Sequence, residues 1–130
     1  MTMIKVLLLI AGGAVGTVCR YYLSGWVQQS TSSAFPYGIF TVNIVGSLVI
    51  GICWGVSEQY NISPHYRLFI FTGLLGGFTT FSSFMLDTMA LFKTGDYKTA
   101  LMYILTSNIF GILAVFLGYI IGKSVCSLAK

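Results

Sequence analysis

Charged residues are scarce in this sequence, and their scarcity excludes a soluble protein. Of the 130 residues, 8% are charged and 56% are hydrophobic, with three acidic residues against seven lysines and arginines. The mean hydropathy is +0.87. A soluble domain of this length needs more polar surface than this composition supplies. We therefore predict an integral membrane protein that is surrounded by lipid, with no nucleic-acid partner.

Residues that commonly carry catalysis or bind metals are also few. The only histidine, His65, stands in a predicted loop beside Pro64. The three cysteines lie within or at the ends of apolar segments, at Cys19, Cys53 and Cys126. No ligand-like spacing joins them to the histidine, and such cysteines usually behave as small hydrophobic residues. The sequence therefore predicts neither an enzyme nor a disulfide or thiolate metal site.

Four long apolar segments make up most of the chain. Each is long enough for the ~20 residues that cross ~30 Å of hydrocarbon as a helix. The first lacks a clear cleavage region and is followed by Arg20, so we interpret it as a retained helix and not as a signal peptide. We expect one all-helical domain, residues 1–130, with transmembrane helices at about 3–27, 38–57, 67–92 and 99–122.

The third segment is interrupted near its centre by glycines and hydroxyl side chains. Residues 76–84 read GGFTTFSSF. In hydrocarbon, non-helical backbone survives only where it lines a cavity or binds a ligand. An unwound turn there exposes carbonyl oxygens, which suit a hard cation such as Na⁺. The alternative is that Gly76 and Gly77 only allow a neighbouring helix to approach closely.

The second segment carries a small and polar stripe with a four-residue period, formed by Asn43, Ser47, Gly51 and Gly55. The last three are most simply packing residues. Asn43 has two N–H donors that cannot stay unpaired in lipid. We therefore expect Asn43 either to face a pore or to form an interhelical hydrogen bond.

The fourth segment repeats this four-residue spacing with Tyr103, Ser107 and Gly111, flanked by Thr106 and Asn108. Residues four apart lie on the same face of a helix. The hydroxyl groups of this face are candidates for lining a path across the membrane.

Two phenylalanines follow the break at a spacing of three, Phe81 and Phe84. If the helix resumes after Thr80, their rings project from one face. Such rings usually pack against lipid or protein. Their edges also carry partial positive charge, which can meet an anion. Together with the Asn43 amide, the ring edges favour a small anion as the ligand.

The lysines and arginines divide almost evenly between the two ends of the predicted bundle. Four helices place both chain termini on one side of the membrane, where four of these residues fall: Lys5, Arg67, Lys123 and Lys130. Lys93 and Lys98 belong to the other side, with Arg20 near it. Either a modest positive-inside excess fixes one orientation, or the chain inserts both ways. Opposed chains would form a dimer whose two-fold axis lies in the membrane plane, near the break.

Three motifs resemble those of the Fluc (CrcB) fluoride channels. They are Gly12-Gly13-x-x-Gly16 with Arg20-Tyr21, Thr41-x-Asn43-x-x-Gly46, and Gly73-x-x-Gly76-Gly77-x-Thr79-Thr80-Phe81-Ser82-x-Phe84. The third motif is specific in order and length, and Tyr103 and Ser107 add a weaker match. The resemblance implies a passive fluoride channel in the bacterial plasma (inner) membrane.

The same resemblance implies roles for individual residues. It implies an antiparallel dual-topology homodimer with two fluoride pores, each lined by Asn43, Phe81, Phe84, Tyr103 and Ser107. The carbonyls of Gly76 and Thr79 would hold a structural Na⁺ at the dimer interface, and Arg20 would lie near a vestibule. Gly111 departs from the hydroxyl residue that some members place there.

Asp87 is the residue on which a competing hypothesis depends. A small dual-topology, proton-coupled multidrug or cation exporter also uses four short helices, but it needs a titratable group deep in the membrane. Asp87, near the end of the third segment, is the only candidate. A non-conducting structural subunit is a third hypothesis, and it needs neither the broken helix nor the aligned phenylalanines.

Overall fold

The described part of the chain folds into four helical segments that are long and apolar enough to cross a membrane, as the sequence predicts. The computed structural model describes residues 2–128. Its helices are α1 (Thr2–Gln29), α2 (Tyr37–Gln59), α3 (Pro64–Arg67), η1 (Leu68–Leu75), α4 (Gly76–Phe78), α5 (Phe81–Lys93) and α6 (Tyr97–Leu128). The four spans, counting α3 to α5 as one, are longer than the expected ranges at both ends because polar residues continue each helix beyond its apolar stretch.

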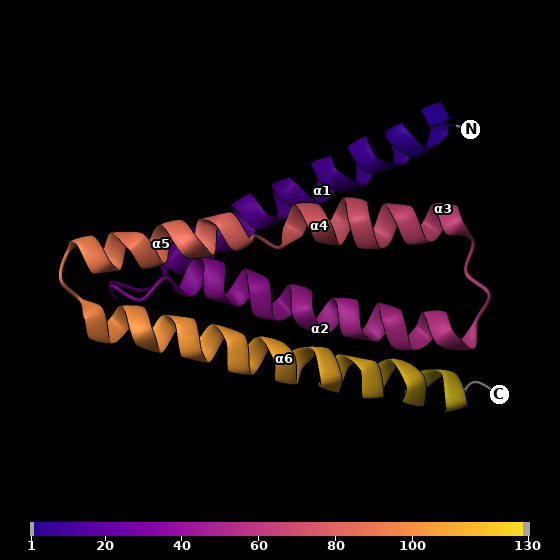
Figure 1. Ribbon diagram of the computed structural model, residues 1–130. Coiled ribbons are helices and arrows are strands. Elements are labelled where there is room, and N and C mark those ends of the chain that lie inside the picture. The colour runs from indigo at the N-terminus through magenta and orange to yellow at the C-terminus, as the bar shows by residue number, and fades with distance from the viewer. Residues whose placement is uncertain (1, 129–130) are drawn as a thin grey trace.

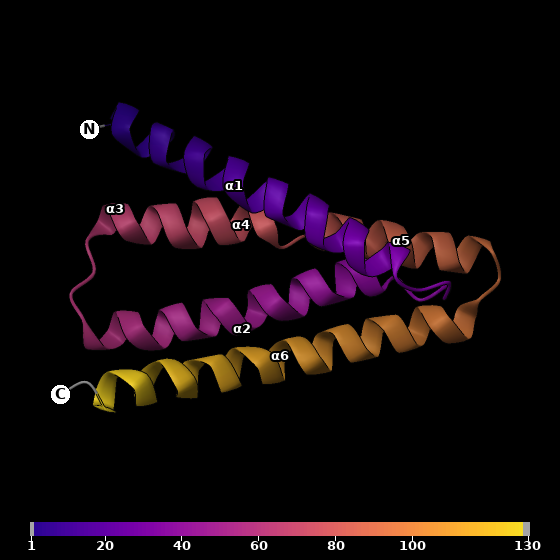
Figure 2. The ribbon, with the colours of Figure 1, turned by 180° about the vertical axis from the view of Figure 1, so that it is seen from behind.

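The segments run up and down, so both ends of the described chain lie at one end of the molecule (Figure 1). This agrees with the expected arrangement of termini, although Lys130 lies outside the described residues. The loops at 30–36 and 94–96 lie together at the opposite end. Seen from behind, α1 crosses the third segment obliquely, near the junction of α4 and α5 (Figure 2).

Helices α2 and α6 pack closely along their length through glycines. A Cβ atom on Gly51 of α2 would collide with the Val115 carbonyl of α6, and one on Gly118 of α6 would collide with the Leu48 carbonyl of α2. Gly55 is similarly pressed against the Tyr119 carbonyl. Small residues at membrane helix contacts let two backbones approach. Gly51 and Gly55 are therefore packing residues, as expected.

The two glycines before the break differ in their surroundings. A Cβ atom on Gly77 would lie 2.7 Å from the Gly13 carbonyl oxygen of α1, so Gly77 is required for close helix packing. The nearest atom to a Cβ on Gly76 is the Phe71 carbonyl oxygen, at 3.8 Å. The packing explanation therefore holds for Gly77 and does not account for Gly76.

The third segment changes its helical form twice before it breaks. Residues Leu68–Leu75 form a π-helix, which the sequence did not predict, and one α-helical turn follows. Thr79 and Thr80 are extended, with φ/ψ of −79°/157° and −150°/120°. Helix α5 then begins at Phe81, with the Thr80 hydroxyl accepting a hydrogen bond from the Ser83 amide. The predicted interruption is therefore confirmed, and its non-helical residues are the two threonines.

Candidate functional site

Asn43 of α2 binds the backbone of the break through two hydrogen bonds, which we call the Asn43 clamp. Its Oδ1 accepts a hydrogen bond from the Thr80 amide at 2.9 Å, and its Nδ2 donates to the Thr80 carbonyl at 3.0 Å. Of the two roles left open for Asn43, the structure shows the interhelical hydrogen bond. A carboxamide has two N–H donors and this contact uses one, so the other is available to a further acceptor.

The clamp and the helix cap release two backbone carbonyls. In an unbroken α-helix, the Gly76 carbonyl would accept from the Thr80 amide and the Thr79 carbonyl from the Ser83 amide. The Thr80 amide donates to Asn43 instead. The Ser83 amide donates to the Thr80 hydroxyl at 3.2 Å. The two carbonyls that the resemblance assigns to Na⁺ are therefore both freed from their helical partners.

Arg20 lies at the break and not near the loop end, where the charge count had placed it. Its Nη1 donates to the Thr79 carbonyl oxygen at 3.5 Å, the long limit of a hydrogen bond. The contact follows from the oblique crossing of α1 over the third segment (Figure 2). Among the described residues, three basic side chains therefore lie at the end with the chain termini, on Lys5, Arg67 and Lys123, and two at the loop end, on Lys93 and Lys98.

Phe81 and Phe84 contact each other but occupy different environments. Their ring centroids are 6.0 Å apart at an interplanar angle of 61°. Phe84 is 5% exposed, whereas Phe81 is 74% exposed. Within one chain, Phe84 therefore belongs to the interior and Phe81 projects from the surface beside the break.

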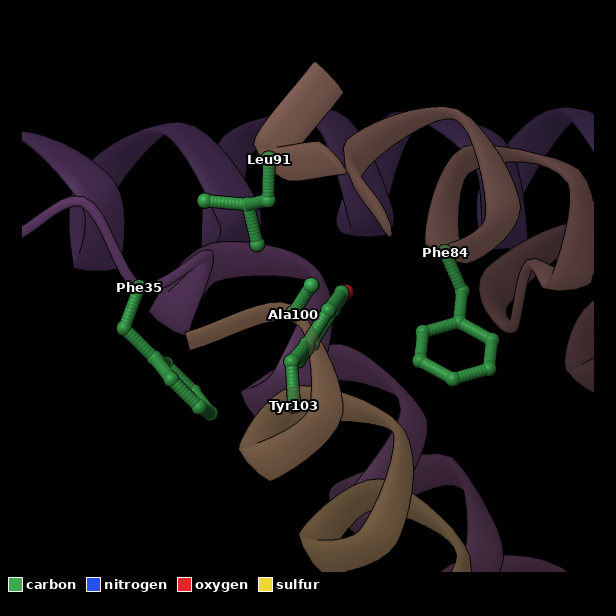
Figure 3. Close-up of a cluster of buried hydrophobic side chains, with 5 residues drawn as sticks. All are labelled: Phe35, Phe84, Leu91, Ala100 and Tyr103. Carbon is green, nitrogen blue, oxygen red and sulfur yellow. The ribbon is translucent and has the colours of Figure 1, made fainter. Parts of the chain in front are cut away.

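Tyr103 lies in the interior, with its ring between two others. It is fully buried, and its centroid is 4.8 Å from that of Phe84 and 5.2 Å from that of Phe35, both in edge contact (Figure 3). The Tyr103 hydroxyl and the Ser107 hydroxyl, one helical turn further along α6, are buried without a hydrogen-bond partner among the residues that the structure describes. Unpaired buried hydroxyls are costly, so such groups usually meet water or a ligand.

Two open cavities flank these residues. One of about 340 Å³ adjoins the break and brings together four predicted site residues, Asn43, Gly76, Thr79 and Phe81. The other, of about 540 Å³, lies at the loop end and is lined by Asp87, with residues of α1, α2 and α5. Phe84, Tyr103 and Ser107 line neither cavity. Phe84 contacts Phe81, which lines the cavity at the break, and thereby joins Tyr103 to that region.

Asp87 is directed toward this interior and not only toward the membrane surface. Its carboxyl lies close to the Tyr103 hydroxyl without meeting hydrogen-bond geometry.

Gly111 lies opposite Ser47 of α2, whose Oγ is 3.8 Å from the position of a Cβ on Gly111. The Ser47 hydroxyl of α2 therefore lies close to position 111, where α6 has a glycine and no hydroxyl group.

Sequence reasoning missed two residues of this region. Thr80 both binds Asn43 and caps α5, and a threonine directly before an amphipathic run is a recognisable N-cap signal. Phe35 lies between the first two predicted helices, where no role was predicted for any residue, yet it is buried against Tyr103. Its contact is between elements far apart in the sequence, so no local signal could have found it.

Comparison with known proteins identifies the family. Residues 7–119 match the family described as CrcB-like protein, Camphor Resistance (CrcB). The chain belongs to the CrcB family. It is 56% identical over 128 residues to a protein of Parabacteroides distasonis, covering 98% of this chain and 100% of that protein. Two further family members are similar over most of their length.

These are proteins of Agrobacterium fabrum, 45% identical over 94% of this chain and 98% of theirs, and of Thermus thermophilus, 43% identical over 91% and 93%. All three relatives carry the name fluoride-specific ion channel FluC. The predicted resemblance is therefore confirmed, and the four apolar helices agree with membership in a family of integral membrane proteins.

Proposed function

We propose that this protein is a fluoride-selective channel of the bacterial plasma membrane that lets fluoride leave the cell down its electrochemical gradient. Full-length similarity to three relatives named as fluoride channels carries the proposal. Hydrogen fluoride enters cells uncharged and dissociates inside, so fluoride ion accumulates there. A passive channel selective for this anion lets the accumulated fluoride leave the cell. Such a protein performs no enzymatic reaction and needs no energy source.

The unpartnered donors in the structure suit a small anion. Fluoride holds its water tightly, so a path must replace that water with hydrogen-bond donors. The buried hydroxyls of Tyr103 and Ser107 are two such donors without a partner among residues 2–128, and the second N–H of Asn43 is a third. The ring edges of Phe81 and Phe84 add weaker positive charge between them.

A second, opposed copy would complete the site. Phe81 is exposed beside the break, Gly76 has open space beside it, and the cavity that they line is open to the surface. Exposed non-helical backbone and polar groups do not face lipid. A two-fold axis in the membrane plane near the break would cover these groups with the same groups of the partner. It would also bring the predicted pore residues of the two chains close to each other.

The freed carbonyls support a structural Na⁺ at that axis. Gly76 and Thr79 of both chains would supply four oxygen ligands, the donor type that hard cations prefer. Thr79 also accepts from Arg20 in the single chain. A carbonyl oxygen has two lone pairs, so it can bind both groups, but the like charges of Arg20 and Na⁺ weaken the site. Na⁺ would hold the dimer together and would not move with fluoride.

The exporter hypothesis gains no support from the structure. Asp87 lies six residues before the end of α5 at Lys93, or about 9 Å along a helix, and it lines the loop-end cavity. An exporter would need this group to exchange protons with its cargo across the membrane. The position suits an acid at the end of a path better than a site at the bilayer midplane.

Reconstituted protein in liposomes tests the proposal. Potassium fluoride-loaded and potassium chloride-loaded vesicles are compared after valinomycin is added, without a pH gradient. We expect rapid fluoride efflux and chloride efflux close to that of protein-free vesicles. Equal efflux of both anions would contradict selectivity, and fluoride efflux that appears only with an imposed pH gradient would contradict a passive channel.

A further inference from the structure

The ring of Tyr103 is held on both sides, and one side comes from the loop between α1 and α2. Phe84 lies on one side of Tyr103 and Phe35 on the other (Figure 3). Both pairs are nearly perpendicular, with interplanar angles of 75° and 76°. Phe84 belongs to the expected pore, whereas Phe35 has no assigned role.

Phe35 is itself fixed in the loop. Its amide donates to the Ser33 hydroxyl at 3.2 Å, and its carbonyl accepts from the Tyr37 amide at 2.8 Å. Its side chain is 6% exposed and also contacts the rings of Tyr37 and Phe40. A loop ring this well anchored can restrain a neighbour. The phenol oxygen is rigidly attached to its ring, so the contacts with Phe35 and Phe84 on the two sides of the ring help to set where the Tyr103 hydroxyl lies.

We propose that Phe35 is a positioning residue for ion conduction: it holds the Tyr103 ring so that the unpartnered hydroxyl stays directed into the fluoride path. The inference rests on the proposed channel function. Phe35 does not contact the ion in this account. Without it, the Tyr103 ring gains room on the Phe35 side, and its hydroxyl no longer stays in one place.

The test compares fluoride efflux per reconstituted dimer for the wild type, Phe35→Leu, Tyr103→Phe and the double variant. We expect Phe35→Leu to lose about two- to tenfold of the flux, the range that one aromatic pair contact supports. In the Tyr103→Phe background, which has no hydroxyl to direct, the same change should have little further effect. Phe35→Tyr keeps the ring and should stay close to the wild type.

Phe92→Leu is the matched control. It removes a ring at the same end of the molecule, where Phe92 contacts Tyr97 at a centroid distance of 5.9 Å. Its flux should equal that of the wild type. If Phe35→Leu yields no dimers, Phe35→Met replaces it, because a flexible thioether refills the space without fixing the neighbouring ring.

Three results would overturn the proposal. They are wild-type flux in Phe35→Leu, an equal loss from the Phe35 change with and without the Tyr103 hydroxyl, and loss of dimers in both the Leu and Met variants, which would make Phe35 a packing residue. A wild-type protein without selective fluoride flux would instead refute the channel function, so the two failures are distinguishable.

Discussion

Replacing Asn43 with leucine should weaken the protein and also reduce its response to Na⁺. Asn43→Leu removes both hydrogen bonds to Thr80. Interhelical hydrogen bonds in membranes average ~0.6 kcal/mol and reach ~1.7 kcal/mol, so the pair contributes about 1–3 kcal/mol. The released Thr80 amide can then return to the Gly76 carbonyl as in an ordinary helix, which takes away one proposed Na⁺ ligand.

Reversible unfolding in mixed micelles, with and without Na⁺, measures both effects. The wild type should gain stability with Na⁺, and Asn43→Leu should be less stable and should gain much less. Ser47→Ala is the control, since Ser47 lines the same cavity one turn further along α2. A variant within ~0.5 kcal/mol of the wild type, the scale of an ordinary surface substitution, with undiminished Na⁺ stabilisation would refute the clamp.

Four other changes have distinct expected outcomes. Phe81→Ile should reduce fluoride efflux while gel filtration shows normal dimers; undiminished efflux would contradict a pore role. Gly77→Ala should lower the dimer yield because its Cβ would lie 2.7 Å from the Gly13 carbonyl, and a normal yield would show that α1 can shift. Two arginines added to the loop at 94–96 should fix one orientation and reduce flux, which coexpression with an oppositely biased copy should restore; failure of rescue would count against opposed chains. Asp87→Asn should preserve passive flux, and complete loss would favour proton coupling.

The sequence predicted the helices and the break because both depend on local properties. Apolar length alone located the four spans. Glycines and threonines at 76–80 located the interruption, because they weaken a helix wherever it lies. The π-helix at Leu68–Leu75 was not predictable in this way, since its residues are as apolar as those of an ordinary membrane helix.

The site was predictable as a set of residues and not as a set of contacts. The four-residue spacing selected Tyr103 and Ser107, and both hydroxyls are buried without partners in the part of the chain that the structure describes. The contact of Arg20 with the break depends on the crossing angle of α1, which no periodicity encodes. The different exposure of Phe81 and Phe84 depends on what packs around each ring, although they are three residues apart on the same helix.

The most direct test of the account is fluoride and chloride efflux per dimer for the wild type and for a double variant, Tyr103→Phe with Ser107→Ala. The double variant removes only the two unpartnered hydroxyls, so folding should not suffer. The account predicts selective fluoride efflux in the wild type and at least ~10-fold less in the variant, equivalent to ~1.4 kcal/mol or more in the barrier. Wild-type efflux in the double variant, with dimers intact in both proteins, would contradict it.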